Sequence, residues 1–573
     1  MLAGPLFSRE LLIAPRQWKH FLMRSAYIAG LFVLMYTAGQ VTFGWQSVRT
    51  VGSVARFGAF VFQVFSLVQL SLVMAFSLLA AAGSVAQEKD RRTLVLLLMT
   101  DLRDRELVGG KLLASLLSVL VLIAASVPVF FIVSMLGGTT VQQILWVQAV
   151  CVLAGLAAGS WGSLVAFWRE KTFQTLALGA LGMVLFVGVI EGIIIAAGDA
   201  SPLAAVGAFN PYRTLGVILN PLAADSRQLE TTVTVSLAAL AVLSAVLMLF
   251  TIFMVRKWNP SKSVYRDAAE DSDAGSASRS RTRHIWDSPL IWREIRTRAY
   301  GRKIFAIKLA YLVLAAFVVL FVQQAAGSET MILGMISAEG FAFVALTLVG
   351  LMLVNAQAVT SVTSERDGQT LELLLVTDVT AKEFVFSKLG GVFYNTKEVI
   401  LVPLLLVAWY AIQGKATVEN TIYLMAGYLA VVLFAAMLGL HGAFSYESSR
   451  TAIANSLGTV FFLFIGIFIC MMLMVEAQAS FALQFTPFLM FILGGSLGLY
   501  ASLTARNPSS ALLLAAGILP FCTFYAITGF LLGETLGVCL MVAFAYGFPT
   551  IAMLVPAVSE FDVALGRTTL DKG

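Results

Sequence analysis

Residues 112–136 read LLASLLSVLVLIAASVPVFFIVSML, an unbroken run of apolar and small residues. A helix needs about 20 such residues to cross the hydrocarbon core of a bilayer. Similar runs recur along the 573 residues, of which 59% are apolar and 12% are charged, with a mean hydropathy of +0.88. Soluble domains carry about 25% charged residues. The composition therefore excludes a soluble protein and predicts an all-α polytopic membrane protein.

The apolar runs predict 14 membrane spans, six in the first half and eight in the second. They are expected near residues 23–39, 59–83, 112–136, 142–166, 173–197, 232–255, 305–324, 338–362, 399–413, 420–443, 452–474, 485–503, 511–532 and 535–557. The alternative is 12 spans, with residues 485–557 forming one span and re-entrant pieces.

Basic residues indicate the orientation of these spans. If the chain starts in the cytosol, all but five of its 38 Lys and Arg residues fall on the cytosolic side, as the positive-inside rule requires. Residues 1–22 do not fit a cleaved signal peptide. We therefore expect a multi-pass protein with both termini in the cytosol, whose basic balance reflects topology and not nucleic-acid binding.

A polar segment divides the chain. Residues 259–286 are rich in Ser, Asp and Arg and almost free of apolar residues, which is typical of a flexible linker. A docking or phosphorylation segment is the alternative. The predicted units are a first transmembrane half at 1–258, the core of a second half at 287–480, and C-terminal spans at 481–573. The four cysteines all lie inside apolar runs, so neither a disulfide framework nor a metal site is predicted.

The two halves share two motifs. PLFSRE at residues 5–10 matches PLIWRE at 289–294 in four of six positions, and EKDRRTLVLLLMTDLRDRELVGGK at 88–111 matches ERDGQTLELLLVTDVTAKEFVFSK at 365–388 in 12 of 24. Matches of this kind indicate an internal duplication. The first half is slightly longer than the second between its two motifs, and we attribute the difference to a longer outer loop in the first hairpin.

The longer motif lies on the cytosolic side, between the second and third predicted spans of each half. Its leucines have the i, i+3, i+4 spacing of one helix face, at Leu94, Leu97 and Leu98 and again at Leu371, Leu374 and Leu375. Thr380 and Glu383 have the spacing of a capping box. Each motif therefore predicts a short amphipathic helix, a polar turn and a helix that enters the membrane.

Such an amphipathic helix can lie at the lipid interface or insert into a groove on another protein. The acids Glu88, Asp90, Asp101 and Glu106 recur in the second half, although an anionic leaflet would repel them. A protein partner is therefore the favoured interpretation.

The shorter motif opens two basic segments, residues 9–19 and 293–303, that are interrupted by apolar residues. This composition is typical of helices on a membrane surface. We expect Arg9, Glu10, Arg293 and Glu294 to lie on the inner surface in such helices. Salt bridges from these residues to the longer motif are the alternative.

These motifs resemble the ABC type-2 permease family, the membrane subunits of many bacterial exporters. The resemblance rests on the PLxxRE openings and on the E-x-D-x-x-T-L-x-L-L-L-x-T-D blocks at residues 88–101 and 365–378. It covers the first six spans and the second half to about residue 474. The chain departs from the usual family pattern at Asp101 and Asp378, where Pro is common, and at Arg92 and Gln369, where Gly is common.

The resemblance implies a pseudo-symmetric pair of six-span permease units in the cell membrane of a bacterium, with cytosolic coupling helices. The chain would be no enzyme and would bind no cofactor, because ATP and Mg would be held by separate ABC ATPase subunits, two copies per chain. The sequence agrees, since it has no G-x-x-x-x-G-K-[ST] phosphate loop. The residues implied in ATPase coupling are Glu88, Asp90, Thr93, Leu94, Leu97, Leu98, Thr100, Asp101, Glu365, Asp367, Thr370, Leu371, Leu374, Leu375, Thr377 and Asp378.

Polar residues within spans are functional candidates. Gln69, Asn355 and Gln357 lie in the second span of each half and can line a path or bond neighbouring helices. Glu191 falls near the outer interface, before a Pro-interrupted stretch reaching Asn220. In similar permeases this stretch dips back into the membrane, so Glu191 marks either an outer gate or a hydrated interfacial carboxylate.

The leading hypothesis is thus the permease subunit of an ATP-driven exporter, with the substrate unidentified. A secondary transporter driven by an ion gradient is the alternative, although acids are scarce near the bilayer midplane. A lipid-modifying membrane enzyme ranks lowest, because no paired acids, Ser/His set or metal cluster shares one face.

Overall fold

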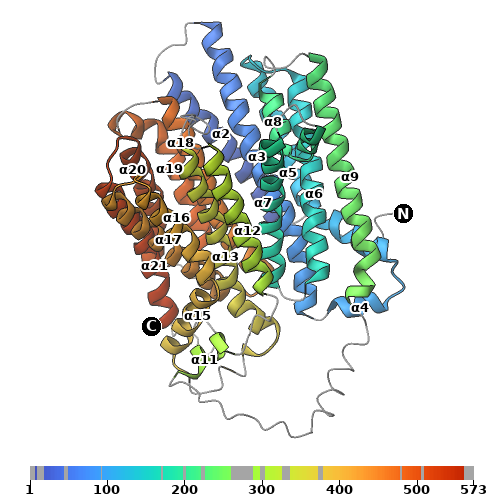
Figure 1. Ribbon diagram of the computed structural model, residues 1–573, viewed down its shortest axis with the longest axis vertical. Coiled ribbons are helices and arrows are strands. Elements are labelled where there is room, and N and C mark those ends of the chain that lie inside the picture. The colour runs from blue at the N-terminus through green and yellow to red at the C-terminus, as the bar shows by residue number, and fades with distance from the viewer. Residues whose placement is uncertain are drawn as a thin grey trace.

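The computed structural model is all-helical in the residues that it describes (Figure 1). These are residues 7–8, 18–43, 50–91, 93–169, 172–197, 202–220, 226–259, 288–296, 304–325, 336–371, 374, 379–477, 481–504 and 509–559. Thirteen of their helices are long and apolar enough to cross a membrane, or 14 if one bent pair counts as a span. The protein is therefore a polytopic helical membrane protein, and all 14 predicted spans coincide with helices. The 259–286 linker lies outside the described residues, apart from residue 259.

The first half contributes six long helices and three short ones. The long helices are α2 (Trp18–Phe43), α3 (Val51–Asp90), α5 (Asp104–Met135), α6 (Val141–Trp168), α7 (Thr172–Ala197) and α9 (Ser226–Trp258). The short ones are α4 (Thr93–Met99), the 3-10 helix η2 (Pro202–Phe209) and α8 (Pro211–Leu219). The η2–α8 pair matches the broken stretch predicted after the fifth span.

The second half begins with a short helix, α11 (Pro289–Arg296). Its other helices are α12 (Ile304–Ala325), α13 (Ala338–Asp367), α15 (Ala381–Asn395), α16 (Lys397–Ile412), α17 (Val418–Ser445), α18 (Ser449–Ala477), α19 (Phe481–Leu503), α20 (Ser510–Leu531) and α21 (Leu536–Ser559). The helices α15 and α16 form the bent pair, with 58° between them.

The duplication extends well beyond the sequence motifs. When Glu88 is aligned with Glu365, the two ends of α5 at Asp104 and Met135 align with the start of α15 at Ala381 and the end of α16 at Ile412. We call this alignment the repeat register. The bent pair is therefore the counterpart of one continuous helix. This equivalence favours 14 spans, as predicted.

The additional residues of the first half do not lie where the sequence analysis put them. The helices α3 and α13 end at equivalent residues, Asp90 and Asp367, but α3 has 40 residues and α13 has 30. The predicted longer outer loop is therefore wrong. The first half instead extends a helix, which keeps its backbone hydrogen bonds internal.

The fourth span of each half packs closely on the second. A Cβ on Gly162 of α6 would lie 2.8 Å from Leu78 O of α3, and one on Gly439 of α17 would lie 2.7 Å from Asn355 O of α13. The two glycines are equivalent in the repeat register, and so are the two carbonyls. The same backbone contact is therefore built twice, and only glycine permits it without a shift of the helices.

The last spans complete the second half and add to it. The helix α21 packs against α17 and α15, as α9 packs against α6 and α5, so α21 takes the place of α9. The helices α19 and α20 stand between α18 and α21, where the first half has only η2 and α8. They form an inserted pair of spans, and this explains why residues 481–573 match the repeat poorly.

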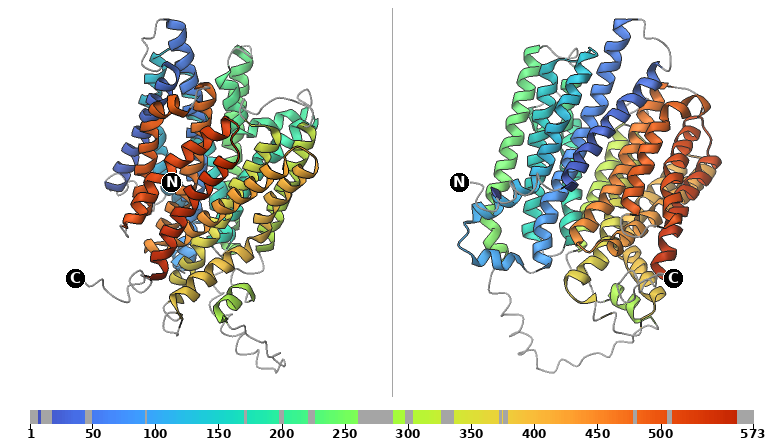
Figure 2. Two further views of the ribbon diagram at one scale, coloured as in Figure 1. Left: turned by 90° about the vertical axis from the view of Figure 1, so that its left-hand side faces the viewer. Right: turned by 180° about the vertical axis from the view of Figure 1, so that it is seen from behind.

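The halves exchange contacts through their first spans. The helix α2 packs on α18 and α19 of the second half, and α12 packs on α7 of the first half. Figure 2 shows α2 running beside the C-terminal helices. Between these contacts, α3 and α13 each touch both α7 and α18. These four helices form the central seam between the halves.

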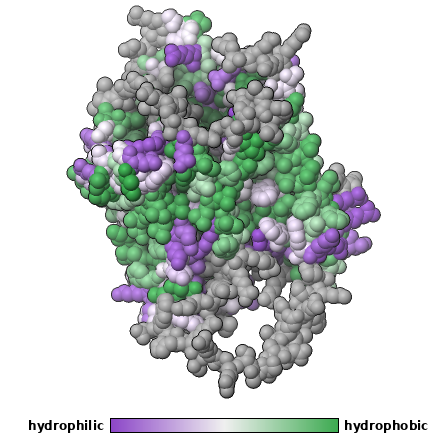
Figure 3. All heavy atoms as spheres, in the orientation of Figure 1, coloured by the Kyte–Doolittle hydropathy of each residue, from purple (hydrophilic) through white to green (hydrophobic). Residues whose placement is uncertain are grey.

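Apolar side chains form a broad band around the middle of the molecule, and hydrophilic ones gather mainly toward its two ends (Figure 3). The short helices α4 and α11 and the start of α15 lie together at one end (Figure 1), which we call the α4 end. This end carries the repeated sequence motifs.

Candidate functional site

The helix α4 carries the leucine stripe of the first motif, and its stripe faces inward. Leu94 and Leu98 are 2% and 8% exposed, and Leu97 packs beside them. Their neighbours come from four long helices and include Val85, Leu107, Val108, Ala166, Phe167 and Val255. The expectation that this stripe inserts into a partner is therefore wrong, because the apolar face is needed to hold α4 on its own bundle.

The opposite face of α4 is exposed and still partly apolar. Leu96 is 63% exposed and Met99 is 72% exposed, and Thr93, Thr100 and Asp101 are exposed beside them. Exposed apolar residues flanked by polar ones are typical of an interaction surface. We call Leu96 and Met99 the outer face of α4. The sequence analysis missed it because it looked for the regular stripe.

The second motif packs in the same way where it is described. Leu371 is 6% exposed and Leu374 is half-buried against the same core. Leu375, Thr377 and Asp378 lie outside the described residues, and so does the side chain of Asp90.

A glutamate and a lysine of the motif form an ion pair in both halves. Lys111 Nζ pairs with Glu88 Oε1, and Lys388 Nζ lies 2.8 Å from Glu365 Oε1. Each pair joins the end of the second span to the start of the third. These acids therefore have an internal partner, which removes them from the argument that recurring acids imply a partner protein.

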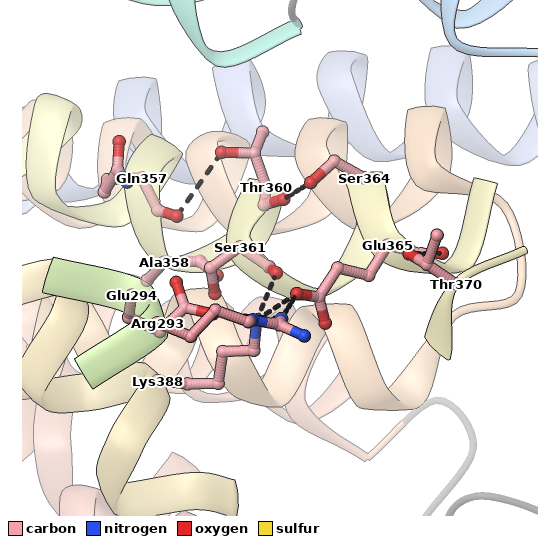
Figure 4. A network of polar contacts seen from close by, with 10 residues as sticks. All are labelled: Arg293, Glu294, Gln357, Ala358, Thr360, Ser361, Ser364, Glu365, Thr370 and Lys388. Carbon is pink, nitrogen blue, oxygen red and sulfur yellow. Dashed lines mark hydrogen bonds and ion pairs between the residues drawn. The ribbon is translucent and has the colours of Figure 1, made fainter. Parts of the chain in front are cut away.

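The second half adds Arg293 and Glu294 of α11 to this pair (Figure 4). Lys388 Nζ lies 2.8 Å from Glu294 Oε1 and donates to Ser361 O at 3.0 Å, and Arg293 Nη2 pairs with Glu365. Of the two placements considered for Arg293 and Glu294, the structure shows the salt bridges. Arg9 and Glu10 lie outside the described residues.

Helix caps account for the remaining recurrent residues of the motif. Thr380 and Glu383 form the predicted capping box at the start of α15, and Glu106 accepts from the backbone N–H of Arg103 at the start of α5. Thr93 and Thr370 donate to the carbonyls of Glu88 and Glu365, respectively, at 3.3 and 3.1 Å. These contacts fix the turns between the second and third spans of each half.

A basic residue ties the second span of each half to the fourth. Lys89 donates to the carbonyls of Phe167 and Arg169, and Arg366 donates to Ala443 O at 3.0 Å. Lys89 and Arg366 are equivalent in the repeat register. The sequence analysis did not single them out, although both occupy the second position of the long motif.

Glu191 belongs to an ion pair near the opposite end of the bundle. Its Oε1 lies 3.1 Å from Arg213 Nε and accepts from Asn210 Nδ2 at 2.6 Å. Both partners lie at α8, so the carboxylate ties α7 to the α8 region. Tyr212 Oη lies 3.1 Å from Ser71 Oγ of α3, and burial raises the pKa of Tyr212 and keeps its phenol neutral.

The polar residues within the second spans mostly bond neighbouring helices. Gln69 Nε2 donates to Gln148 Oε1 at 2.8 Å, and Asn355 Nδ2 donates to Ala435 O at 2.9 Å. Gln357 is fully buried, and its amide atoms have no partner in the described part of the chain. Gln69 and Asn355 therefore serve helix packing, the commoner of the two roles considered for them.

Comparisons with known proteins add no assignment. No protein-family model matches this chain, and neither a curated protein nor a solved structure matches it. The duplicated helical architecture and the residues at the α4 end are therefore the basis for its function.

Proposed function

We propose that this chain is the permease subunit of an ATP-driven exporter and that separate ATPase subunits bind at its α4 end. The observation that carries the proposal is the outer face of α4, where Leu96 and Met99 are 63% and 72% exposed. This face lies in a motif that occurs twice. A duplicated docking element suits a pair of identical ATPase subunits.

The packing of α4 suggests how motion of an ATPase would reach the membrane. Leu94 and Leu98 touch residues of α3, α5, α6 and α9. A tightly packed core transmits displacement because it has little free volume. A partner that moves α4 would therefore move the second, third, fourth and sixth spans of the first half together.

The ion-pair network gives the second half a comparable connection. It joins α11 to the end of α13 and to the start of α15 through Glu294, Glu365 and Lys388. Since α13 belongs to the central seam, movement at the α4 end would reach the contact between the halves. We propose that the translocation path opens along this seam, between α3, α7, α13 and α18.

The proposal is tested by purifying the tagged full chain from its native membrane in mild detergent. We expect an ATPase with its own phosphate loop to co-purify at two copies per chain. The double variant L96D/M99D should reduce this to one copy and lower ATPase activity, since the first docking surface alone is changed. Mass spectrometry measures the stoichiometry.

Val418→Asp is the matched control. Val418 is 73% exposed, as Met99 is 72% exposed, but it starts α17 at the opposite end of the bundle. Copy number and activity should stay unchanged in this variant. If the wild-type chain purifies without an ATPase, and substrate enters vesicles only under an imposed ion gradient, the chain is instead a secondary transporter.

A further inference from the structure

Polar residues interrupt the third span of the second half. Residues 395–398 read NTKE, whereas the equivalent residues 118–121 of α5 read SVLV. The chain bends by 58° at this point, between α15 and α16. The continuous helix of the first half shows that the fold does not require this break.

The break lies within the apolar layer. The helix α16 has 16 residues and so extends about 24 Å from Lys397 to Ile412, while the hydrocarbon core is about 30 Å thick. With Ile412 at one boundary, Lys397 lies several ångströms inside the other, on the side of the α4 end. Leu401 and Leu405 on α16 are 49% and 65% exposed, as expected for side chains that face lipid.

One positive charge at the break is left without an acid. Lys308 of α12 lies 2.7 Å from Glu398 Oε2, and this pair is neutral. Lys397 is exposed, and its ammonium lies 4.2 Å from the ring centre of Tyr394. We call Lys308, Tyr394, Asn395, Lys397 and Glu398 the α12–α16 polar patch. In Figure 3, hydrophilic side chains interrupt the lower part of the apolar band over this region.

The backbone adds donors to the same patch. Thr396 precedes α16 but its side chain does not cap the helix, because its hydroxyl donates to Val392 O at 2.8 Å. The first N–H groups of a helix have no partner within the helix and carry its positive dipole end. The amide nitrogen of Asn395 is also buried and has no partner in the described part of the chain. Donors and a cation are thus gathered where an acceptor is missing.

We propose that the α12–α16 polar patch binds the phosphate-bearing headgroup of an anionic lipid from the leaflet on the side of the α4 end. The phosphate would accept from the Lys397 ammonium, and its acyl chains would cover Leu401 and Leu405. A charged side chain is costly in hydrocarbon unless it is paired. An anionic lipid supplies the charge and the apolar cover together, whereas free phosphate supplies only the charge.

The test is native mass spectrometry of the delipidated full chain in mild detergent, titrated with phosphatidylglycerol. We expect one tightly bound lipid per chain and a raised unfolding temperature. Lys397→Gln should weaken binding about fivefold, because a basic residue near a lipid surface contributes on the order of one such factor. Lys397→Arg should retain binding.

Lys382→Gln is the control, since Lys382 is an exposed lysine at the start of α15. It should bind phosphatidylglycerol as the wild type does. Equal binding by the wild type and Lys397→Gln, or equal weakening by Lys382→Gln, overturns the site. Inorganic phosphate that gives the same stabilisation as the lipid overturns the assignment to a lipid. Phosphatidylcholine should bind more weakly, because its cation cancels the charge that Lys397 attracts.

Discussion

The ammonium of Lys388 lies 2.8 Å from Glu294 Oε1, and both side chains are almost fully buried, at 3% and 2% exposed. Its counterpart Lys111 pairs with Glu88, and these two side chains are 13% and 25% exposed. The same ion pair thus occurs in a drier setting in the second half, with a second carboxylate. Removing a partner from a buried pair leaves an uncompensated charge.

We therefore predict that Lys388→Met is more destabilising than Lys111→Met. Lys388→Met leaves the guanidinium of Arg293 to serve two carboxylates, and losing one partner of a buried pair costs about 3–5 kcal/mol. Lys111→Met should cost less, because water reaches Glu88. The unfolding temperature of each purified variant in detergent measures the difference.

Lys388→Met combined with Glu294→Leu should recover part of the lost stability, since the unpaired charge is then removed as well. An equal loss in Lys111→Met and Lys388→Met would show that burial of the network does not matter. The network would then be no different from a surface salt bridge, which contributes about 0–1 kcal/mol.

The two faces of α4 should respond oppositely to truncation. Leu94→Ala removes a side chain that is 2% exposed, and such core truncations cost about 2–5 kcal/mol. Leu96→Ala changes a residue that is 63% exposed, and surface changes stay within about 0.5 kcal/mol. Thermal unfolding of both variants checks this. A larger effect from Leu96→Ala would mean that α4 is turned the other way.

The orientation of α4 shows where sequence reasoning stopped. The spacing of Leu94, Leu97 and Leu98 correctly indicates one apolar helix face. Periodicity cannot tell whether that face covers the bundle of its own chain or a groove in a partner, because both bury the same area. The 14 spans were predictable for the opposite reason, since a bilayer demands a run of apolar residues of fixed length.

The network at α11 was only partly predictable. Glu88 with Lys111 and Glu365 with Lys388 recur at one separation, which is the signal that they pair. Glu294 and Lys388 are far apart in the sequence, on α11 and α15, and pairing over such a distance depends on how the helices pack. The central seam, the α19–α20 insertion and the bend at Asn395 depend on packing in the same way.

Gln369 gives a prediction about backbone strain. It has a φ of +56° after α13, in the left-handed region that costs a non-glycine residue about 1–2 kcal/mol. This is a position where the resembling family usually has glycine. Gln369→Gly should therefore raise stability by roughly 0.5–1 kcal/mol, after the greater entropy loss of glycine is subtracted.

Gln369→Ala is the control for that measurement. It removes the same side-chain polar atoms but keeps the Cβ, so the strain stays and the unfolding temperature should not rise. If the alanine and glycine variants are equally stabilised, the side chain and not the backbone conformation is the source of the effect.

The bent α15–α16 pair gives the prediction that decides the number of spans. Because it is equivalent to the continuous helix α5, it should cross the membrane once. Lys382, at the start of α15, and Lys415, after α16, must then lie on opposite sides. Single cysteines at these two positions, in a background with the four native cysteines replaced, should react with a membrane-impermeant maleimide from opposite faces of sealed vesicles.

A cysteine at Met99 supplies the reference for that experiment. Met99 is exposed on α4, so it should share its side with Lys382 and differ from Lys415. If Lys382 and Lys415 instead react from the same face, α15 and α16 form a re-entrant hairpin, and α17 starts on the side where α13 ends. That outcome would contradict the hydrogen bond from Arg366 to Ala443 O, which joins the C-terminal ends of α13 and α17 and so requires these helices to run parallel. The duplication could then no longer include the spans after α16.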